Sequence, residues 1–455
     1  MPTDTPARDE RLGWIGDAEA FAPTAAFNYE VAPFFTKWLG DLAADQKASG
    51  SVPDVIPDVL TRARPDGGGS SGWADAATIV PWQLYLSYGD ARLLERQYPS
   101  MRRWVEYERG AAGPALIWTT GHHYGDWLDF ASTQPGGDPG RAATPKDLVA
   151  TAFFAHSADL VARAAAVLGN ADDARAYRDL FERVRAAFQH TYVAGDGRLS
   201  PETQTAYALA LEFDLLPGGL RQAAGDRLAA AVKQSGHLTT GFLGTPHLTD
   251  ALVHTGHVPE AYGLLLRRDY PSWLYPITRG ATTMWERWDG VKPDGTFEDV
   301  GMNSFNHYAY GAVGDWMYRT VAGLTLDPSA PGYKHVLVQP HPGGRLTSAS
   351  ATLTTPYGPV GSAWTLAGDT FRLAVRVPAN TRATVRLPFA TLARVAEGGR
   401  PVAAAAGVTR AVQDGEAVRV DVGSGDYRFT YPAPRLAAVV RTPPATPPAD
   451  GGRHP

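Results

Sequence analysis

Residues 27–48 read FNYEVAPFFTKWLGDLAADQKA, and their apolar side chains recur every three or four positions. This spacing places the apolar side chains on one face of an α-helix. The loops that follow are rich in Gly, Trp, Asp and His, at 61–73, 118–143, 236–247 and 270–302. Many helices joined by long, aromatic and polar loops predict a helical toroid whose loops form a cleft at one end. The other helical patterns lie at 74–88, 90–110, 145–168, 171–191, 203–215, 219–235, 258–268 and 303–323.

The pattern changes after Asp327-Pro328. Short alternating stretches with a period of two predict β-strands, and we expect an all-β sandwich or jelly roll. The Pro-rich end of the chain is expected to be a disordered tail. The predicted organisation is a helical domain over 1–328, a smaller all-β domain over 329–432 and a tail over 433–455. Examples of the alternating stretches are 334–339, 349–355, 371–376, 384–387 and 417–422.

Composition excludes several function classes. The formal net charge of −5 and the lack of a Lys/Arg-rich run argue against nucleic acid as a partner. A chain without cysteine has no disulfide, no Cys-bound zinc and no thiol nucleophile. There is no Gly-x-Ser-x-Gly elbow and no convincing metal-ligand spacing. We therefore expect neither a serine hydrolase nor a metal or other cofactor.

Two further features concern compartment and ligand. The N-terminal residues, MPTDTPARDERLGW, resemble no secretory signal, and no apolar run approaches the ~20 residues that span a bilayer. We therefore expect a cytoplasmic protein with no membrane partner. The chain has 12 Trp residues, more than a core requires. Sugar-binding clefts use such rings because the apolar face of a pyranose stacks on them.

The first group of candidate residues is the segment DTPARDERLGWIGD, residues 4–17. It combines acids, arginines and a tryptophan, and Pro and Gly interrupt it. One interpretation is an exposed terminus followed by a helix with Asp17 as N-cap. The other is an acid-bearing loop of the cleft. Composition alone leaves both open.

The second group is GATTMWERWD, residues 280–289, where Glu286 lies between two tryptophans. Aromatic walls desolvate a carboxylate and raise its pKa, which suits acid–base chemistry near neutral pH. The alternative is a surface ion pair of Glu286 with Arg287 or Arg279, covered by the indoles. Glycoside hydrolysis requires two carboxylates that flank the bond, and these two loops could supply them.

Three more segments are candidates for the cleft lining. Trp73 precedes a helix, and the neighbouring Asp75 could simply cap it. Trp127 lies in Gly125–Asp129, after His122-His123-Tyr124, and could equally fill the core. His307 is carried by the predicted helix 303–323, which the segment Asn303–Tyr308 opens. A lone histidine in such a place is more often structural than catalytic.

These segments carry a resemblance to a known family. PTDTPARDERLGWIGDAEAF (2–21) and GATTMWERWDG (280–290) are similar to signatures of bacterial α-L-rhamnosidases of glycoside hydrolase family 78. The resemblance covers most of residues 1–430 and implies an (α/α)6 barrel followed by a β-sandwich. In that family, β domains and the opening helices of the barrel precede the first motif. We therefore expect a chain without these β domains and a barrel without these opening helices. Further similar segments, in the same order, are SGWADAATIVPW (71–82), YGDWLDF (124–130) and SFNHYAYGAVGDWMY (304–318).

The resemblance also implies a reaction and residue roles. The family removes terminal α-L-rhamnose from glycosides and polysaccharides with inversion, without a metal in the chemistry. By motif position, Glu10 corresponds to the general acid and Glu286 to the general base. The expected sugar-binding residues are Asp4, Arg8, Trp14, Asp17, Trp73, Trp127 and His307. Thr5 stands where the family usually has Cys, and Ile15 where Thr is common.

Three other functions remain as alternatives. One is an inactive module that still binds rhamnose, and it would show binding without turnover. Another is an inverting toroid glycosidase for a different sugar, which a panel of aryl glycosides would identify. A polysaccharide lyase is the third and least favoured, because lyases need a base beside a neutralised uronate and the acid–aromatic setting of Glu286 does not suggest one.

Overall fold

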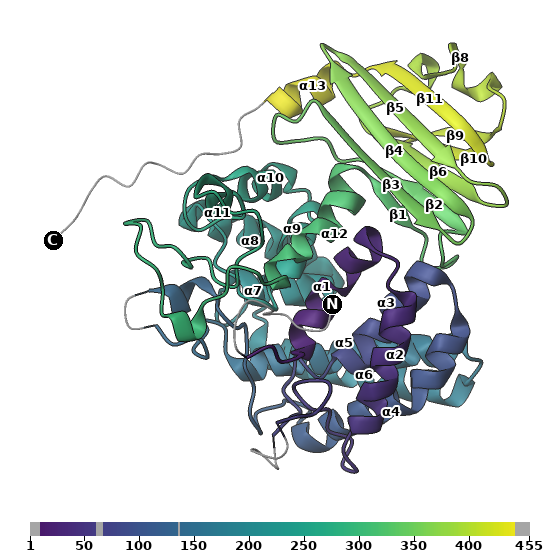
Figure 1. Cartoon of the computed structure of the whole chain (residues 1–455). Coiled ribbons are helices and arrows are strands. Elements are labelled where there is room, and N and C mark those ends of the chain that lie inside the picture. The colour runs from purple at the N-terminus through teal and green to yellow at the C-terminus, as the bar shows by residue number, and fades with distance from the viewer. Residues whose placement is uncertain (1–9, 61–66, 135–136, 442–455) are drawn as a thin grey trace.

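The computed structural model describes residues 10–60, 67–134 and 137–441. Helices occupy the chain up to Val321, and strands dominate from Leu324 onward (Figure 1). The larger helices are α1 (Ile15–Asn28), α2 (Ala32–Asp45), α3 (Ala76–Tyr88), α4 (Ala91–Ala112), α5 (Lys146–Val167), α6 (Ala171–Tyr192), α7 (Gln204–Glu212), α8 (Arg221–Ser235), α9 (Thr245–His254) and α10 (Val258–Leu266). The short helices are α11 (Leu274–Thr278), α12 (Val313–Trp316) and α13 (Pro434–Arg441).

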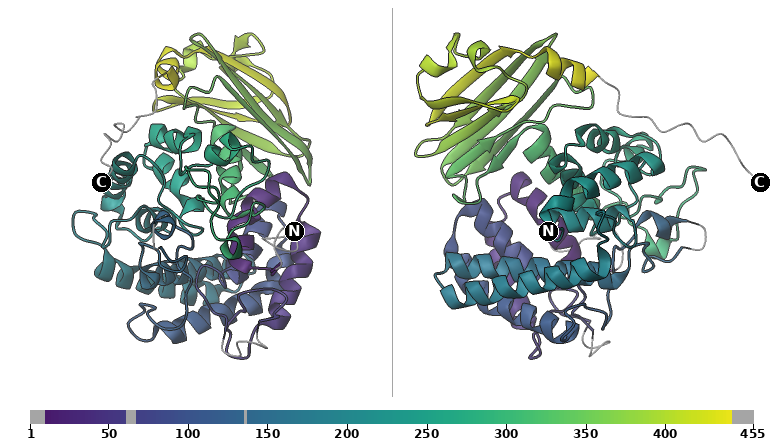
Figure 2. Two further views of the ribbon diagram at one scale, coloured as in Figure 1. Left: turned by 60° about the vertical axis from the view of Figure 1, so that its left-hand side comes forward. Right: turned by 180° about the vertical axis from the view of Figure 1, so that it is seen from behind.

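The helices form a double ring. Within the described residues, the inner ring consists of α1, α3, α5, α7, α9 and the helical segment 309–321, each packed on the next, and 309–321 packs back on α1. Helices α2, α4, α6, α8 and α10 lie outside this ring. The long α5 and α6 lie side by side in the view from behind (Figure 2). Inner helices are buried nearly all round, as α5 shows, whereas outer helices have one buried face. The predicted (α/α)6 barrel is confirmed.

Several predicted helix bounds are wrong. The pattern over 27–48 belongs to two helices, because Tyr29 is extended and Pro33 begins the first turn of α2. Helix α9 lies partly in the predicted loop 236–247 and was missed. The predicted helix 303–323 is instead a sequence of 3₁₀, α and π turns within 309–321. The described residues include no helix that is long and apolar enough to cross a membrane.

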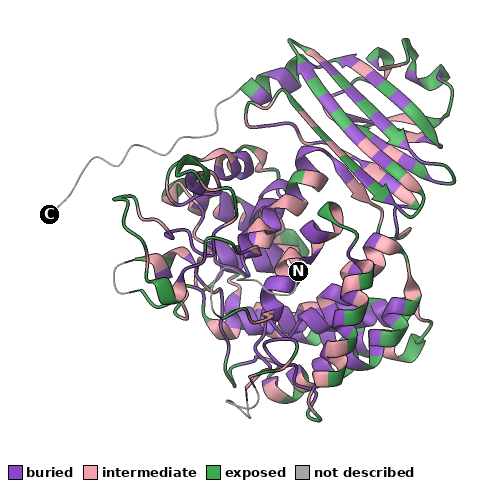
Figure 3. Cartoon of the chain, viewed as in Figure 1, coloured by how far each residue is buried: buried purple, intermediate pink, exposed green. Residues whose placement is uncertain are grey.

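The strands form a sandwich of two sheets. One sheet has the order β1-β2-β6-β10-β9 and the other β3-β4-β5-β11-β7-β8. Among the described strands, β2 and β6 are the only parallel pair. Buried and exposed residues alternate along the strands, so the buried sides make a shared core (Figure 3). The strands are β1 (Leu324–Leu326), β2 (His335–Val338), β3 (Ser348–Thr355), β4 (Gly358–Ala367), β5 (Thr370–Val377), β6 (Arg382–Leu387), β7 (Ala396–Glu397), β8 (Arg400–Pro401), β9 (Val408–Asp414), β10 (Ala417–Val422) and β11 (Gly425–Pro432).

Two predicted domain limits need correction. Strand β1 pairs with β2, so the β structure begins before residue 329. The predicted tail 433–455 is wrong for Pro434–Arg441, which forms α13. Leu436, Ala437 and Val440 of this helix are buried in the sandwich core. Their apolar spacing outweighs the Pro-rich composition around them.

Polar contacts join the two parts of the chain. The indole N–H of Trp364 donates to the carbonyl of Val321 (2.7 Å), and the Ser362 hydroxyl donates to that of Ala322 (2.6 Å). Nearby, the Arg319 guanidinium pairs with Asp250 and Asp315. These contacts fix the end of segment 309–321 to both α9 and the sandwich.

Two histidines beside this junction make stability depend on pH. Burial lowers the pKa of His156 to about 3 and that of His247 to about 4. Both rings pack on Phe213, and the His156 ring is stacked on it at 4.1 Å. An unfolded histidine has a pKa of about 6.5. Below that pH the unfolded chain binds protons that the folded chain does not, so stability is lost as the pH falls.

We predict that the double variant His156→Leu/His247→Leu loses less stability on acidification than the parent. Between pH 7 and 5 its loss in free energy of unfolding should be smaller by roughly 2–4 kcal/mol, since each histidine contributes up to about 1.4 kcal/mol per pH unit. Urea unfolding at the two pH values measures this. His190→Leu, at an exposed position of α6, is the control. Equal losses in the parent and the double variant would contradict the assignment.

Candidate active site

A cavity of about 230 Å³ lies where the N-terminal end of α1 meets the barrel loops. The opposite end of α1 points toward the sandwich, where Phe27 packs against the sandwich core. The cavity is therefore at the barrel end that faces away from the β-sheets, because α1 runs from that end toward them (Figure 1). Its lining is Glu10, Trp14, Asp17, Trp73, Tyr124, Trp127, Phe242, Glu286, Met302 and His307.

The first acid-bearing segment is held by backbone contacts and by its own tryptophan. The N–H of Ile56 donates to Gly13 O (2.9 Å), and that of Ile15 donates to Asp54 O (3.1 Å). The Trp14 indole N–H donates to Glu10 Oε1 at 2.5 Å. Glu10 itself is exposed at the mouth of the cavity. A carboxyl in this position can reach a bond that projects out of the cavity.

Asp17 and His307 approach each other from distant parts of the chain. Asp17 lies in the first turn of α1 and is buried, with its Oδ1 3.2 Å from Nε2 of His307. The N-cap of α1 is Trp14, so the interpretation of Asp17 as N-cap is wrong. Gly16 allows this helix to approach Trp73, because a Cβ there would lie 2.6 Å from the indole ring.

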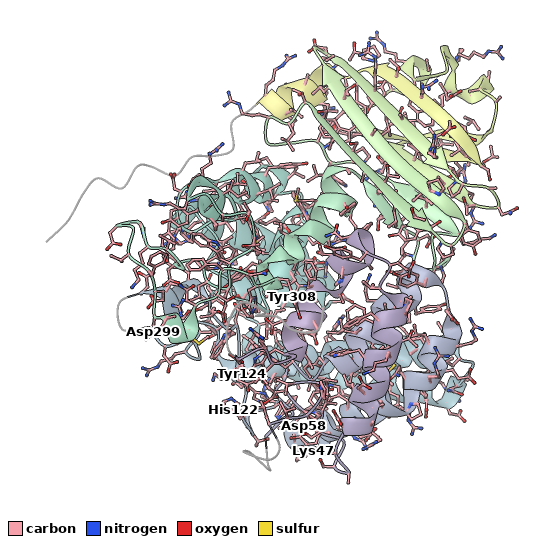
Figure 4. All side chains as sticks on the ribbon, viewed as in Figure 1. Lys47, Asp58, His122, Tyr124, Asp299 and Tyr308 are labelled. Carbon is pink, nitrogen blue, oxygen red and sulfur yellow. The ribbon has the colours of Figure 1, made fainter. Side chains whose placement is uncertain are left out.

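Tyr124 is the centre of the aromatic wall. Its ring contacts Trp14 (5.5 Å), Trp73 (4.8 Å) and Trp127 (5.6 Å between centroids). Its hydroxyl donates to Oδ2 of Asp54 at 3.1 Å. Burial raises the pKa of Asp54, and the hydrogen bond from Tyr124 opposes that rise. Figure 4 shows Tyr124 among the loops at this end of the barrel, with Tyr308 above it.

Asp126 connects the Trp127 loop to residues 241–244. Its fully buried carboxylate accepts the N–H groups of Gly241 (2.8 Å), Leu243 (2.9 Å) and Gly244 (2.9 Å), and the Thr205 hydroxyl. Burial raises the pKa of Asp126, and these donors oppose the rise. Phe242, which lines the cavity, lies inside the segment that the carboxylate holds.

The carboxylate of Asp75 also holds a segment of the cavity lining, the one that contains Trp73. Asp75 occupies the N-cap position of α3, as the alternative proposed, but its side chain makes no capping hydrogen bond. Its buried carboxylate instead accepts the N–H of Gly72 (2.7 Å) and the indole N–H of Trp104 (3.2 Å). The backbone on either side of Trp73 is thereby fixed.

The second acid-bearing segment places Glu286 deep in the cavity. Glu286 is 3% exposed, and its N–H donates to Ser304 O at 2.9 Å. The N–H of His307 donates to Met284 O (2.9 Å). Residues 284–286 and 304–307 therefore lie side by side. The Arg287 guanidinium pairs with Asp289 (2.8 Å), and Arg279 donates to Pro293 O. Glu286 is therefore not part of an exposed surface pair.

The cavity unites most of the predicted site residues. Glu10, Trp14, Asp17, Trp73, Trp127, Glu286 and His307 all line it. Asp4 and Arg8 lie outside the described residues. The role of each residue stays a prediction. Sequence reasoning missed Tyr124, Phe242 and Met302 as lining residues, although all three lie in loops that it had marked as aromatic. In the described part of the chain, no group of three His, Asp or Glu side chains could hold a metal ion.

Comparison with known proteins assigns this architecture to a family. The model of the bacterial alpha-L-rhamnosidase six-hairpin glycosidase domain matches residues 1–321, which is more than half of the chain. The chain belongs to this family. The model of the bacterial alpha-L-rhamnosidase C-terminal domain matches residues 323–400.

Individual members of the rhamnosidase family are similar over nearly the whole chain. An α-L-rhamnosidase of Streptomyces avermitilis is 48% identical over 94% of this chain and 39% of its own length. One of Formosa agariphila is 42% identical over 85% of this chain and 41% of its own. This chain thus spans about two fifths of the length of these relatives.

Solved structures of rhamnosidases have the same fold. The S. avermitilis α-L-rhamnosidase complexed with L-rhamnose superposes with a TM-score of 0.86 at 47% identity, over 94% of this chain and 39% of that one. The enzyme of Aspergillus terreus gives a TM-score of 0.84 at 38% identity, over 95% of this chain and 47% of that one.

We predict that Asp126→Asn weakens the site. In the parent, both carboxylate oxygens accept from N–H groups, whereas the NH2 group of asparagine would face one of these N–H groups as a second donor. The free energy of unfolding should therefore fall by about 2–3 kcal/mol. Urea unfolding measures the loss. Asp196→Asn, at an exposed turn, should change stability by less than about 0.5 kcal/mol. Similar effects of the two substitutions would contradict the role given to Asp126.

Proposed function

We propose that this chain hydrolyses terminal α-L-rhamnosides with inversion of configuration. The observation that carries the proposal is the meeting of two acid-bearing loops, 276 residues apart in sequence, in one aromatic cavity that contains Glu10 and Glu286. Family membership and the rhamnose complex of the S. avermitilis relative support the choice of sugar. No cofactor is needed for this chemistry.

The positions of the two carboxyls, one at the mouth of the cavity and one inside it, are consistent with the two roles. Glu10, exposed at the mouth, would protonate the glycosidic oxygen as the bond to the leaving group breaks. Glu286, buried and anchored next to Ser304, would remove a proton from water that attacks the anomeric carbon from the opposite face. Inverting enzymes hold the two carboxyls ~6.5–9.5 Å apart to leave room for that water.

The remaining lining residues suit recognition of a 6-deoxy sugar. Trp14, Trp73 and Trp127, joined through Tyr124, form an apolar surface. The methyl group and one apolar face of rhamnose can be buried against it, at about 25 cal/mol per Å². Asp17 and His307, which also line the cavity, would supply polar groups for the sugar hydroxyls. A sugar with a hydroxymethyl group in place of the methyl would bury a polar group there.

We predict that the parent releases p-nitrophenol from p-nitrophenyl α-L-rhamnopyranoside, and that Glu286→Gln lowers kcat by about 10²–10⁴-fold because it removes the proton transfer from water. Glu10→Gln should lower kcat by a similar factor on an α-L-rhamnosyl disaccharide, because a sugar leaving group needs protonation more than p-nitrophenolate does. Azide should restore turnover in Glu286→Gln, because this variant has lost the activation of water. It should not restore turnover in Glu10→Gln. Glu95→Gln, at an exposed position of α4, is the matched control and should keep parental activity.

The same assay distinguishes the other functions. A folded parent that is silent on the rhamnoside but active on another aryl glycoside would replace the sugar assignment. A folded parent that is silent on all of them, yet is stabilised by free L-rhamnose in thermal melting, would be a rhamnose-binding module. Loss of activity in only one of the two glutamine variants would contradict the paired roles.

A further inference from the structure

A second, larger cavity of about 690 Å³ adjoins the first one. Met302 lines both cavities, and Arg287 of the second follows Glu286 of the first in the chain. On the other side, Gly140 packs against the Trp127 ring, and the neighbouring Pro139 lines the second cavity. A ligand that extends out of the first cavity between these walls would enter the second.

The walls of the second cavity are rich in charge. The nearly buried guanidinium of Arg287 binds both oxygens of Asp289, at 2.8 and 3.2 Å. Lys292 Nζ lies 3.1 Å from Glu298 Oε2, which is 3.9 Å from Arg287 Nη2. With Asp294 and Asp299 also in the lining, four carboxylates face two cations. Figure 4 shows Asp299 at the outer edge of these loops.

One aromatic ring contributes to this lining. Tyr270 is half-buried, and its hydroxyl donates to Thr133 Oγ1 at 2.8 Å. Burial raises its pKa to about 12, so the ring stays neutral. Most of the other lining residues offer hydroxyl, amide, carboxylate or cationic groups, including Ser132, Thr133 and Gln134.

We propose that the second cavity holds the leaving group of the proposed reaction, and that this group is a neutral sugar. A pyranose has an apolar face for Tyr270 and hydroxyls that can both donate and accept among the charged side chains. The excess of carboxylates repels a uronate. A flat apolar leaving group would cover charged groups without giving them hydrogen bonds, which is unfavourable.

This proposal rests on the proposed function, and its test separates the two. The substrates are p-nitrophenyl α-L-rhamnoside and two α-L-rhamnosyl disaccharides, one with a neutral hexose and one with the matching hexuronic acid as leaving group. The parent should show a kcat/KM for the neutral disaccharide that is roughly tenfold above that for the uronate, as expected for repulsion at a partly buried site. A uronate cleaved as well as the neutral sugar would overturn the proposal.

Asp294→Asn/Asp299→Asn removes two negative charges while an amide can keep both local backbone hydrogen bonds. It should raise kcat/KM for the uronate several-fold relative to kcat/KM for the neutral disaccharide. Asp172→Asn/Asp179→Asn, which removes the same charge from exposed positions of α6, should change neither. An equal rise in this control would show a general charge effect and overturn the proposal.

Binding provides a readout that does not need turnover. Titration of the neutral and uronate disaccharides into Glu286→Gln should give the same order of affinity as the kinetics. If p-nitrophenyl rhamnoside is not cleaved by the parent, the proposed function fails, and this titration still tests the second cavity. Equal affinity for the two disaccharides would count against a neutral-sugar site.

Discussion

The buried carboxylate of Asp126 is the contact on which the site depends most. It joins the Trp127 loop to residues 241–244 through three backbone N–H groups and a hydroxyl. Two lining residues of the cavity, Trp127 and Phe242, thus belong to segments that one side chain holds together. A buried carboxylate can join two segments only where both of its oxygens accept hydrogen bonds. A buried carboxylate oxygen without a hydrogen-bond donor would strongly destabilise the fold. The closed helical ring supplies the rigid base from which these loops extend.

Much of the fold could be predicted from the sequence. The apolar periodicity of α2 to α8 and the alternation in β2, β5 and β10 result from local geometry, which neighbouring residues reveal. Helix α9 was missed because it begins within a Gly- and Pro-containing loop. Helix α13 was missed because its composition resembles a tail, while three apolar residues dock it on the sandwich. Segment 309–321 departs from an ideal helix through packing on α1 that no local pattern encodes.

The site was predictable in its residue types but not in its arrangement. Acids beside tryptophans marked both candidate segments, and family similarity added the predicted roles. The central position of Tyr124 depends on a hydrogen bond to Asp54, 70 residues earlier. The importance of Asp126 depends on donors more than 75 residues away. Such long-range partners leave no spacing signal in the sequence, so only the folded chain reveals them.

The most direct test of the account is the anomeric form of the sugar that is released first. If Glu10 and Glu286 act from opposite faces of one rhamnose, water attacks opposite the leaving group. Proton NMR of an α-L-rhamnoside mixed with the parent should then show β-L-rhamnose first, with the α form appearing later by mutarotation. Initial release of α-L-rhamnose would contradict the paired acid–base arrangement.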